Sequence, residues 1–87
     1  MYRFAAKRDS NEKSIFKALV TAGAQPIRGT DSDIYARHAK GFGVLLEVKT
    51  KDGTLRPIQV ELQALFGDRY HVVRSEEEAL RACGRMV

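Results

Sequence analysis

The segment Phe42 to Lys49 constrains the fold of this chain more than any other. Its sequence, Phe-Gly-Val-Leu-Leu-Glu-Val-Lys, is apolar over most of its length and rich in residues that favour β-strands. Side chains alternate between the two faces of a strand, so one face here is wholly apolar and the other ends in two charges. The apolar face holds Phe42, Val44, Leu46 and Val48, and the other holds Leu45, Glu47 and Lys49. So apolar a strand in a small protein should be central, and we expect a sheet built around it.

The rest of the pattern predicts three helices and three further strands. Ile15, Phe16, Leu19 and Ala22 recur at helical spacing, with Asp9 or Ser10 as the cap and Gly23 at the end. Pro57 suits the first turn of a second helix, and Ser75 with Glu78 forms a capping box for a third. The expected elements cover residues 10–22, 24–28, 33–36, 42–49, 57–66, 70–73 and 75–83. The order α-β-β-β-α-β-α indicates an α/β fold.

The length of 87 residues leaves room for one domain, spanning residues 1–87. A domain of this size buries only about 60–65% of the surface that its unfolded chain exposes, and it usually needs a metal, a disulfide or a partner subunit. Cys83 is the only cysteine, which excludes a disulfide within the chain. We interpret Cys83 as a small buried hydrophobe rather than a reactive thiol, and no zinc-ligand spacing occurs.

The charge of the chain favours a polyanionic partner. The net charge is +4, and residues 1–60 hold eleven Lys and Arg against six Asp and Glu. Such a balance suits contacts to phosphates, which release counterions on binding. The sequence has no apolar run long enough for a bilayer and no secretory signal, so we expect a cytoplasmic protein without membrane contact.

Three residues on two expected strands suggest chemistry. Glu47 and Lys49 share one face near the end of an apolar strand, which is costly unless water, a metal or a ligand meets them. Asp33 opens the preceding strand fourteen residues upstream and reaches the same place if the two strands are neighbours. Two carboxylates suit Mg²⁺ or Mn²⁺, and an ammonium group beside them can neutralise charge on a phosphate. The alternative is a solvated strand end in which Asp33 only opens a turn.

These residues resemble a known signature. Ser-Asp33-Ile followed by Leu-Leu-Glu47-Val-Lys49 is similar to the motif of the PD-(D/E)XK nuclease superfamily. The continuation Thr-Lys-Asp-Gly-Thr-Leu-Arg-Pro-Ile-Gln59 resembles the VRR-NUC branch, where a Gly-x-Leu turn precedes a helix carrying a Gln. The closing Val-Val-Arg-Ser-x-Glu-Glu-Ala fits that branch, so the resemblance covers roughly residues 9–80. It departs at Ser32, where the family often has proline. Asp31 is a second candidate for the acidic role, but Asp33 leads directly into Ile34-Tyr35.

The resemblance implies a restriction-endonuclease-like α-β-β-β-α-β core with a C-terminal helix and a mixed central sheet. It assigns Asp33 and Glu47 as ligands of Mg²⁺ or Mn²⁺, helped by the Val48 carbonyl. Lys49 would position or activate the attacking water, and Gln59 would face the site from the second helix unless it is an exposed helix residue.

Further residues are candidates with open alternatives. Glu12 continues the apolar stripe of the first helix and could point into the site, but Asp9 and Glu12 also have the spacing of a capping box. His38 fits a loop or phosphate-contact role better than a metal-ligand role. We expect phosphate contacts close to the site from five cations, namely Arg28, Arg37, Lys40, Lys51 and Arg56.

The expected function is therefore a metal-dependent, structure-selective DNA endonuclease. Stand-alone proteins that this chain resembles tend to act as homodimers on branched DNA, in the manner of Holliday-junction resolvases, and a dimer would add buried surface. The small size suits a phage protein acting in the host cytoplasm. The alternatives are a non-catalytic DNA-binding or assembly module with the nuclease fold, and a nuclease that acts on RNA.

Overall fold

The computed structural model describes residues 11–30 and 32–86 and has an α/β fold. Its elements in chain order are α1 (Glu12–Thr21), β1 (Ile27–Arg28), β2 (Ile34–Arg37), β3 (Gly43–Val48), α2 (Pro57–Phe66), a 3₁₀ turn (Gly67–Arg69), β4 (Tyr70–Val73) and α3 (Glu76–Ala82). The predicted order of helices and strands is confirmed. In the described residues, no helix has both the length and the apolar character needed to cross a membrane.

The four strands form one mixed sheet in the order β1-β2-β3-β4. The pairs β1–β2 and β2–β3 are antiparallel, and β3–β4 is parallel. Strand β3 thus lies between two neighbours, as its apolar sequence predicts. The register sets Ile34 opposite Leu46 and Val73 opposite Val48, which brings the start of β2 and the end of β4 to the carboxyl end of β3.

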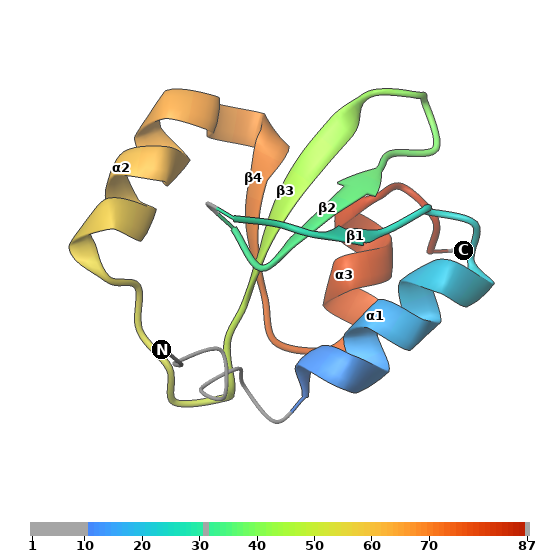
Figure 1. Ribbon diagram of the computed structural model, residues 1–87, viewed down its shortest axis with the longest axis horizontal. Coiled ribbons are helices and arrows are strands. Elements are labelled where there is room, and N and C mark those ends of the chain that lie inside the picture. Colours follow the sequence, from blue (N-terminus) through green and yellow to red (C-terminus); the bar gives the residue numbers. More distant parts are fainter. Residues whose placement is uncertain (1–10, 31, 87) are drawn as a thin grey trace.

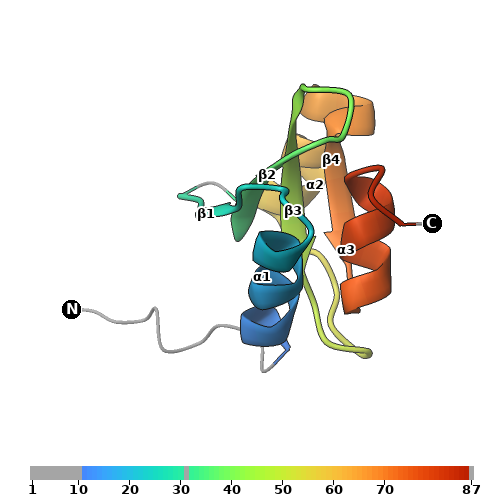
Figure 2. The same ribbon diagram turned by 90° about the vertical axis from the view of Figure 1, so that its right-hand side faces the viewer.

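Helices α1 and α3 pack side by side against one face of the sheet, and α2 lies on the other side (Figures 1 and 2). The core lies under α1 and α3 and contains the apolar face of β3. Its largest fully buried side chains are Ile15, Leu19, Ile34, Val44, Leu46, Val48, Val73 and Cys83. Burying such aliphatic side chains contributes about 1.5–3 kcal/mol each. Cys83 is fully buried, as interpreted from the sequence, and burial raises the pKa of its thiol.

The helix ends follow local chemistry, with one shift from expectation. Helix α1 begins at Glu12 with Asn11 as its N-cap, two residues later than predicted. The expected caps Asp9 and Ser10 lie outside the described residues. In α3 the Ser75 hydroxyl accepts from the Glu78 amide at 3.1 Å, as the capping-box pattern predicts.

Helix α2 differs from α1 and α3 in that none of its apolar residues is buried. Only Gln59 is buried among its residues. Four of its large apolar side chains are 40–76% exposed, namely Ile58, Val60, Leu65 and Phe66. The helix therefore contributes a polar side chain to the sheet and presents an apolar surface outward.

Candidate active site

Glu47 is a carboxylate buried on the face of β3 that α2 covers. Its side chain lies opposite the apolar face because residues alternate along the strand, and the residue is only 4% exposed. The Gln59 amide donates to Glu47 Oε2 at 2.7 Å, and the Tyr70 hydroxyl donates to Oε1 at 3.3 Å. These bonds reduce the cost of burying the carboxyl group and fix its orientation.

The structure brings Asp33 to the same place. Asp33 directly precedes β2, and the antiparallel pairing of Ile34 with Leu46 sets it beside the end of β3. The Val48 amide donates to Asp33 Oδ2 at 2.8 Å, and Asp33 also interacts with the Glu47 carboxyl group through a hydrogen bond. The two carboxyl groups expected from the motif therefore meet directly.

Ser32 anchors the chain just before Asp33. Its hydroxyl donates to the Leu46 carbonyl at 2.8 Å, and the residue is only 5% exposed. This bond ties the approach to β2 onto the central strand at the position where the similar family often has proline. A side-chain hydrogen bond here restrains the backbone that a proline ring would otherwise restrain.

The surroundings of Glu47 disfavour its ionised form. Burial, the charge of Asp33 and its hydrogen bond to Glu47 together raise the pKa of Glu47 to about 7, against the opposite effects of Lys49 and Tyr70. Burial and the Glu47 charge also raise the pKa of the Tyr70 hydroxyl, which keeps it a hydrogen-bond donor. Near neutral pH the Glu47 carboxyl group thus readily holds a proton. A divalent cation would relieve the same repulsion.

Gln59 reaches the site because of its place in the first turn of α2. Its Oε1 accepts from the Arg56 amide at 2.8 Å, which leaves Nε2 directed at Glu47. The residue is 2% exposed, so the alternative of an exposed helix polar residue is wrong. One side chain thus caps the helix and orients the carboxylate.

Lys49 follows β3 directly, and its main chain is fixed on two sides. Its amide donates to the Val73 carbonyl at 3.0 Å, and its carbonyl accepts from Asn11 Nδ2 at 3.1 Å. Its side chain is 13% exposed, with Nζ 3.7 Å from Glu47 Oε2. The ammonium group therefore lies next to the carboxyl pair, where it can meet a bound phosphate.

Sequence reasoning missed two residues of this site. Tyr70 could have been found, because it starts a strand that pairs in parallel with β3, and in that register it shares the face of Glu47. Asn11 gave no usable signal, since the first helix was expected to begin at residue 10 and its N-cap to be Asp9 or Ser10. Its amide reaches across the chain to the carbonyls of Lys49 and Arg74.

Glu12 is buried and contacts an arginine of β1. It forms an ion pair with Arg28, whose guanidinium also lies 4.4 Å from the centre of the Phe16 ring. As the first residue of α1, Glu12 is not at the third helical position that a capping box requires. Residues 11–30 and 32–86 contain no group of three or more His, Cys, Asp or Glu that could hold a metal. Glu12 thus contacts Arg28, and its expected part in the site stays a prediction.

The five expected phosphate contacts do not form one cluster. Lys51 and Arg56 lie in the connection between β3 and α2. Arg28 is paired with Glu12. Arg37 lies opposite Gly43, the first residue of β3. Gly43 and Lys49 are separated by about 20 Å along the strand, at ~3.3 Å per residue, so Arg37 is remote from the carboxyl pair. Lys40 lies in the β2–β3 turn beyond Arg37.

His38 has a structural role in that distant turn. Its ring stacks on Phe42 with the centroids 4.4 Å apart, and its Nδ1 accepts from the Lys40 amide at 3.0 Å. This agrees with the loop role given to His38 from the sequence. The turn lies at the end of the hairpin remote from Glu47 (Figure 1).

The chemistry of the donor atoms fits a hard divalent cation. Asp33 and Glu47 supply carboxylate oxygens, and the intervening main chain at Val48 is held against Asp33. Oxygen donors of this kind are those that Mg²⁺ and Mn²⁺ prefer. With two carboxylates alone, much of the coordination sphere would be left to water and to a phosphate.

Comparisons with known proteins leave the family of this chain open. No protein-family model matches the sequence, and no curated protein or solved structure matches it significantly. The interpretation of the site therefore depends on the side chains around Glu47 and on the resemblance of the sequence motif.

Proposed function

We propose that this protein is a metal-dependent endonuclease that hydrolyses phosphodiester bonds in DNA. One observation carries the proposal, which is the meeting of Asp33, Glu47 and Lys49 at the carboxyl end of the central strand. A carboxyl pair, buried at Glu47 and partly exposed at Asp33, with an ammonium group beside it is an arrangement for binding a cation and a phosphate together. A purely structural ion pair would not need the second carboxylate.

The order of elements supports a restriction-endonuclease-like core of the PD-(D/E)XK type. The sequence motif proposed for that superfamily falls on Asp33, at the start of β2, and on Glu47 and Lys49, at the end of β3. The VRR-NUC-like Gln59 lies on α2 and contacts Glu47. The motif residues are thus neighbours in space as well as in the pattern.

The residues of the chain have distinct parts in the proposed reaction. Asp33, Glu47 and the Val48 carbonyl would hold Mg²⁺ or Mn²⁺, which would supply an activated water and neutralise charge on the phosphate. Gln59 and Tyr70 hold the Glu47 carboxylate in place through its two oxygens. The Lys49 ammonium group stabilises negative charge that develops on the phosphate in the transition state.

We further propose that the substrate is branched DNA and that the protein acts as a homodimer, in the manner of a Holliday-junction resolvase. The outward apolar surface of α2 supports a dimer, because four large apolar side chains there are exposed to solvent. Lys51 and Arg56, in the connection that follows β3, are the most suitable phosphate contacts. A phage protein acting in the host cytoplasm would fit this description.

A cleavage assay tests the proposal. Labelled four-way junctions, flaps, matching duplexes and single strands, of DNA and of RNA, are incubated with Mg²⁺, Mn²⁺ or EDTA. We expect cuts in branched DNA that need the metal and that Lys49→Ala abolishes. Lys40→Ala is the matched control, because Lys40 lies at the remote end of the β2–β3 hairpin.

A second candidate is a non-catalytic DNA-binding or assembly module. The observation in its favour is that Glu47 already has Gln59, Tyr70, Lys49 and Asp33 as partners without any cation. Tight DNA binding without cleavage under any metal, together with no Mn²⁺ affinity at the carboxyl pair, would establish this module and refute the nuclease. Cleavage of RNA alone would replace the DNA substrate.

A further inference from the structure

Arg74 lies beside Lys49 at the carboxyl end of the sheet. The parallel register pairs Val48 with Val73, so Arg74 follows β4 as Lys49 follows β3. Asn11 joins the two positions, because its Nδ2 donates to the carbonyl of Lys49 at 3.1 Å and to that of Arg74 at 3.0 Å. The main chains of Lys49 and Arg74 are thus held to the same side chain.

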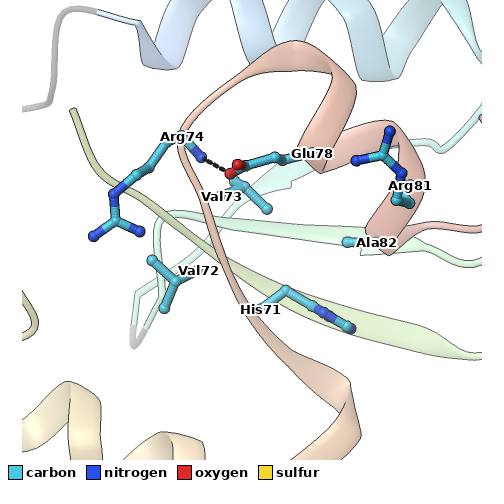
Figure 3. Close-up of a pocket in the computed structure, with 7 residues that line it drawn as sticks. All are labelled: His71, Val72, Val73, Arg74, Glu78, Arg81 and Ala82. Atoms are coloured by element: carbon cyan, nitrogen blue, oxygen red, sulfur yellow. Dashed lines mark hydrogen bonds between the residues drawn. The ribbon is translucent and has the colours of Figure 1, made fainter. Parts of the chain in front are cut away.

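The Arg74 guanidinium points toward the chain that follows β3. Figure 3 shows the Arg74 amide bonded to Glu78, while the guanidinium points away from α3 and from His71 and Arg81. Its Nη2 donates to the Gly53 carbonyl at 2.7 Å. Arg74 therefore joins the end of β4 to the turn after β3.

That turn packs on the stem of Lys49. The Gly53 amide donates to the Thr50 carbonyl at 3.0 Å, which closes the turn. A Cβ atom added at Gly53 would lie 3.3 Å from both Cβ and Cδ of Lys49. The absence of a side chain at Gly53 therefore lets the turn lie directly against the aliphatic part of Lys49.

We propose that Arg74 is a positioning residue that acts through Gly53 to hold the Lys49 ammonium group against Glu47. The guanidinium fixes the Gly53 carbonyl, the turn restrains the Lys49 stem, and the stem sets where Nζ lies. The inference deepens the proposed nuclease function and rests on it. Positioning of a reacting group matters because a misplacement of about 1 Å can lower a rate about a hundredfold.

The main test compares Arg74→Met with Arg81→Met. Both substitutions remove an exposed guanidinium and keep a long side chain, but only Arg74 bonds to the turn. Arg74→Met should lower kcat about tenfold to a hundredfold, with KM for DNA and Mn²⁺ affinity unchanged. In the protein without DNA, NMR relaxation of the Lys49 Cε methylene should show increased mobility. Arg81→Met should change neither kcat nor the mobility of Lys49. Arg74→Lys should restore part of kcat and part of the restraint on Lys49.

Gly53→Ala provides a second variant that keeps every hydrogen bond of the turn. The new methyl group meets the flexible stem of Lys49, which can move by a few tenths of an ångström without unfolding the chain. We expect a smaller loss of kcat, about threefold to tenfold, and altered Lys49 Cε and Cδ chemical shifts.

The outcomes separate this inference from the proposed function. Unchanged Lys49 mobility in Arg74→Met overturns the positioning role. So does an effect confined to KM for DNA with a weaker salt dependence of DNA binding, because that result marks a direct phosphate contact. If the unaltered protein neither cuts DNA nor binds Mn²⁺, the proposed function fails. The NMR comparison still decides whether Arg74 restrains Lys49.

Discussion

The two faces of β3 are made by the same six-residue strand but differ in what covers them. One face, Val44, Leu46 and Val48, is at most 2% exposed under α1 and α3. The other carries Glu47, equally buried at 4% exposure but held by polar partners from α2 and β4. Equal burial thus has opposite consequences, because apolar burial stabilises the fold whereas burial of a carboxyl group is costly unless its partners compensate.

Substitution at Glu47 should show the difference between the two faces of β3 most clearly, in cleavage activity against stability. Glu47→Gln keeps the size of the side chain and removes its negative charge, so it should lower metal-dependent cleavage about a thousandfold or more, equivalent to about 4 kcal/mol. Stability should hold or rise, because the repulsion from Asp33 is removed. Single-turnover cleavage and urea unfolding measure the two quantities. Near-normal cleavage would exclude Glu47 from the site.

Substitution on the apolar face should give the reverse result. Leu46→Ala opens a cavity beneath α1 and α3, where Leu46 is fully buried, and should lower the free energy of unfolding by about 2–5 kcal/mol. Urea unfolding measures this loss. Leu45→Ala is the control on the other face of the same strand, where the residue is half-buried, and should cost less than half as much. Equal losses at Leu45 and Leu46 would contradict the asymmetry.

The pH dependence of stability should reveal the cost of burying the ionised Glu47 carboxyl group on the polar face of β3. The pKa of Glu47 is raised from 4.5 to about 7 in the folded protein, so between these values the folded state binds more protons than the unfolded state. The contribution of Glu47 to the free energy of unfolding is therefore fully present below pH 4.5 and is lost as the pH rises through 7. The expected loss is about 1–3 kcal/mol.

Urea unfolding of the unaltered protein and of Glu47→Gln between pH 4 and 8 isolates this contribution. The difference between the two free energies of unfolding should change with pH in that window and level off above it. A difference that does not vary with pH would mean that Glu47 ionises in the folded protein as it does in the unfolded chain.

The apolar face could be predicted from the sequence in detail, whereas the polar face could be predicted only in part. Alternation along residues 42–49 and helical spacing around Ile15 and Leu19 are local patterns, and they gave the core and the order of elements. The contact of Asp33 with Glu47 could be predicted by pairing two strands that are neighbours in the sequence. Local periodicity and adjacent pairing therefore account for what was foreseen.

The remaining features of the site depend on contacts between distant parts of the chain. Asn11 bonds to two residues that are 38 and 63 positions further along the sequence. No local sequence pattern predicts contacts over such separations. The pairing of Glu12 with Arg28 depends on how α1 lies over the sheet. Arg37 was expected near Glu47, but an antiparallel hairpin takes successive residues of β2 steadily away from the end of β3. These positions are set by tertiary packing.

The smallest expected effect concerns Tyr70, the first residue of β4, which lies on the same face as Glu47. Its hydroxyl donates to Glu47 Oε1 at 3.3 Å and favours the ionised carboxylate, so this bond lowers the pKa of Glu47. Tyr70→Phe keeps the ring and removes the donor, and should raise that pKa by roughly half a unit to one unit, at a cost of about 1 kcal/mol in stability at neutral pH. Carbon-detected NMR titration of the Glu47 carboxyl group measures the shift. Tyr35→Phe is the matched control, because Tyr35 lies on the neighbouring strand β2 opposite Leu45. An unchanged pKa in Tyr70→Phe would mean that Gln59, Asp33 and Lys49 set the ionisation of Glu47 without help from β4.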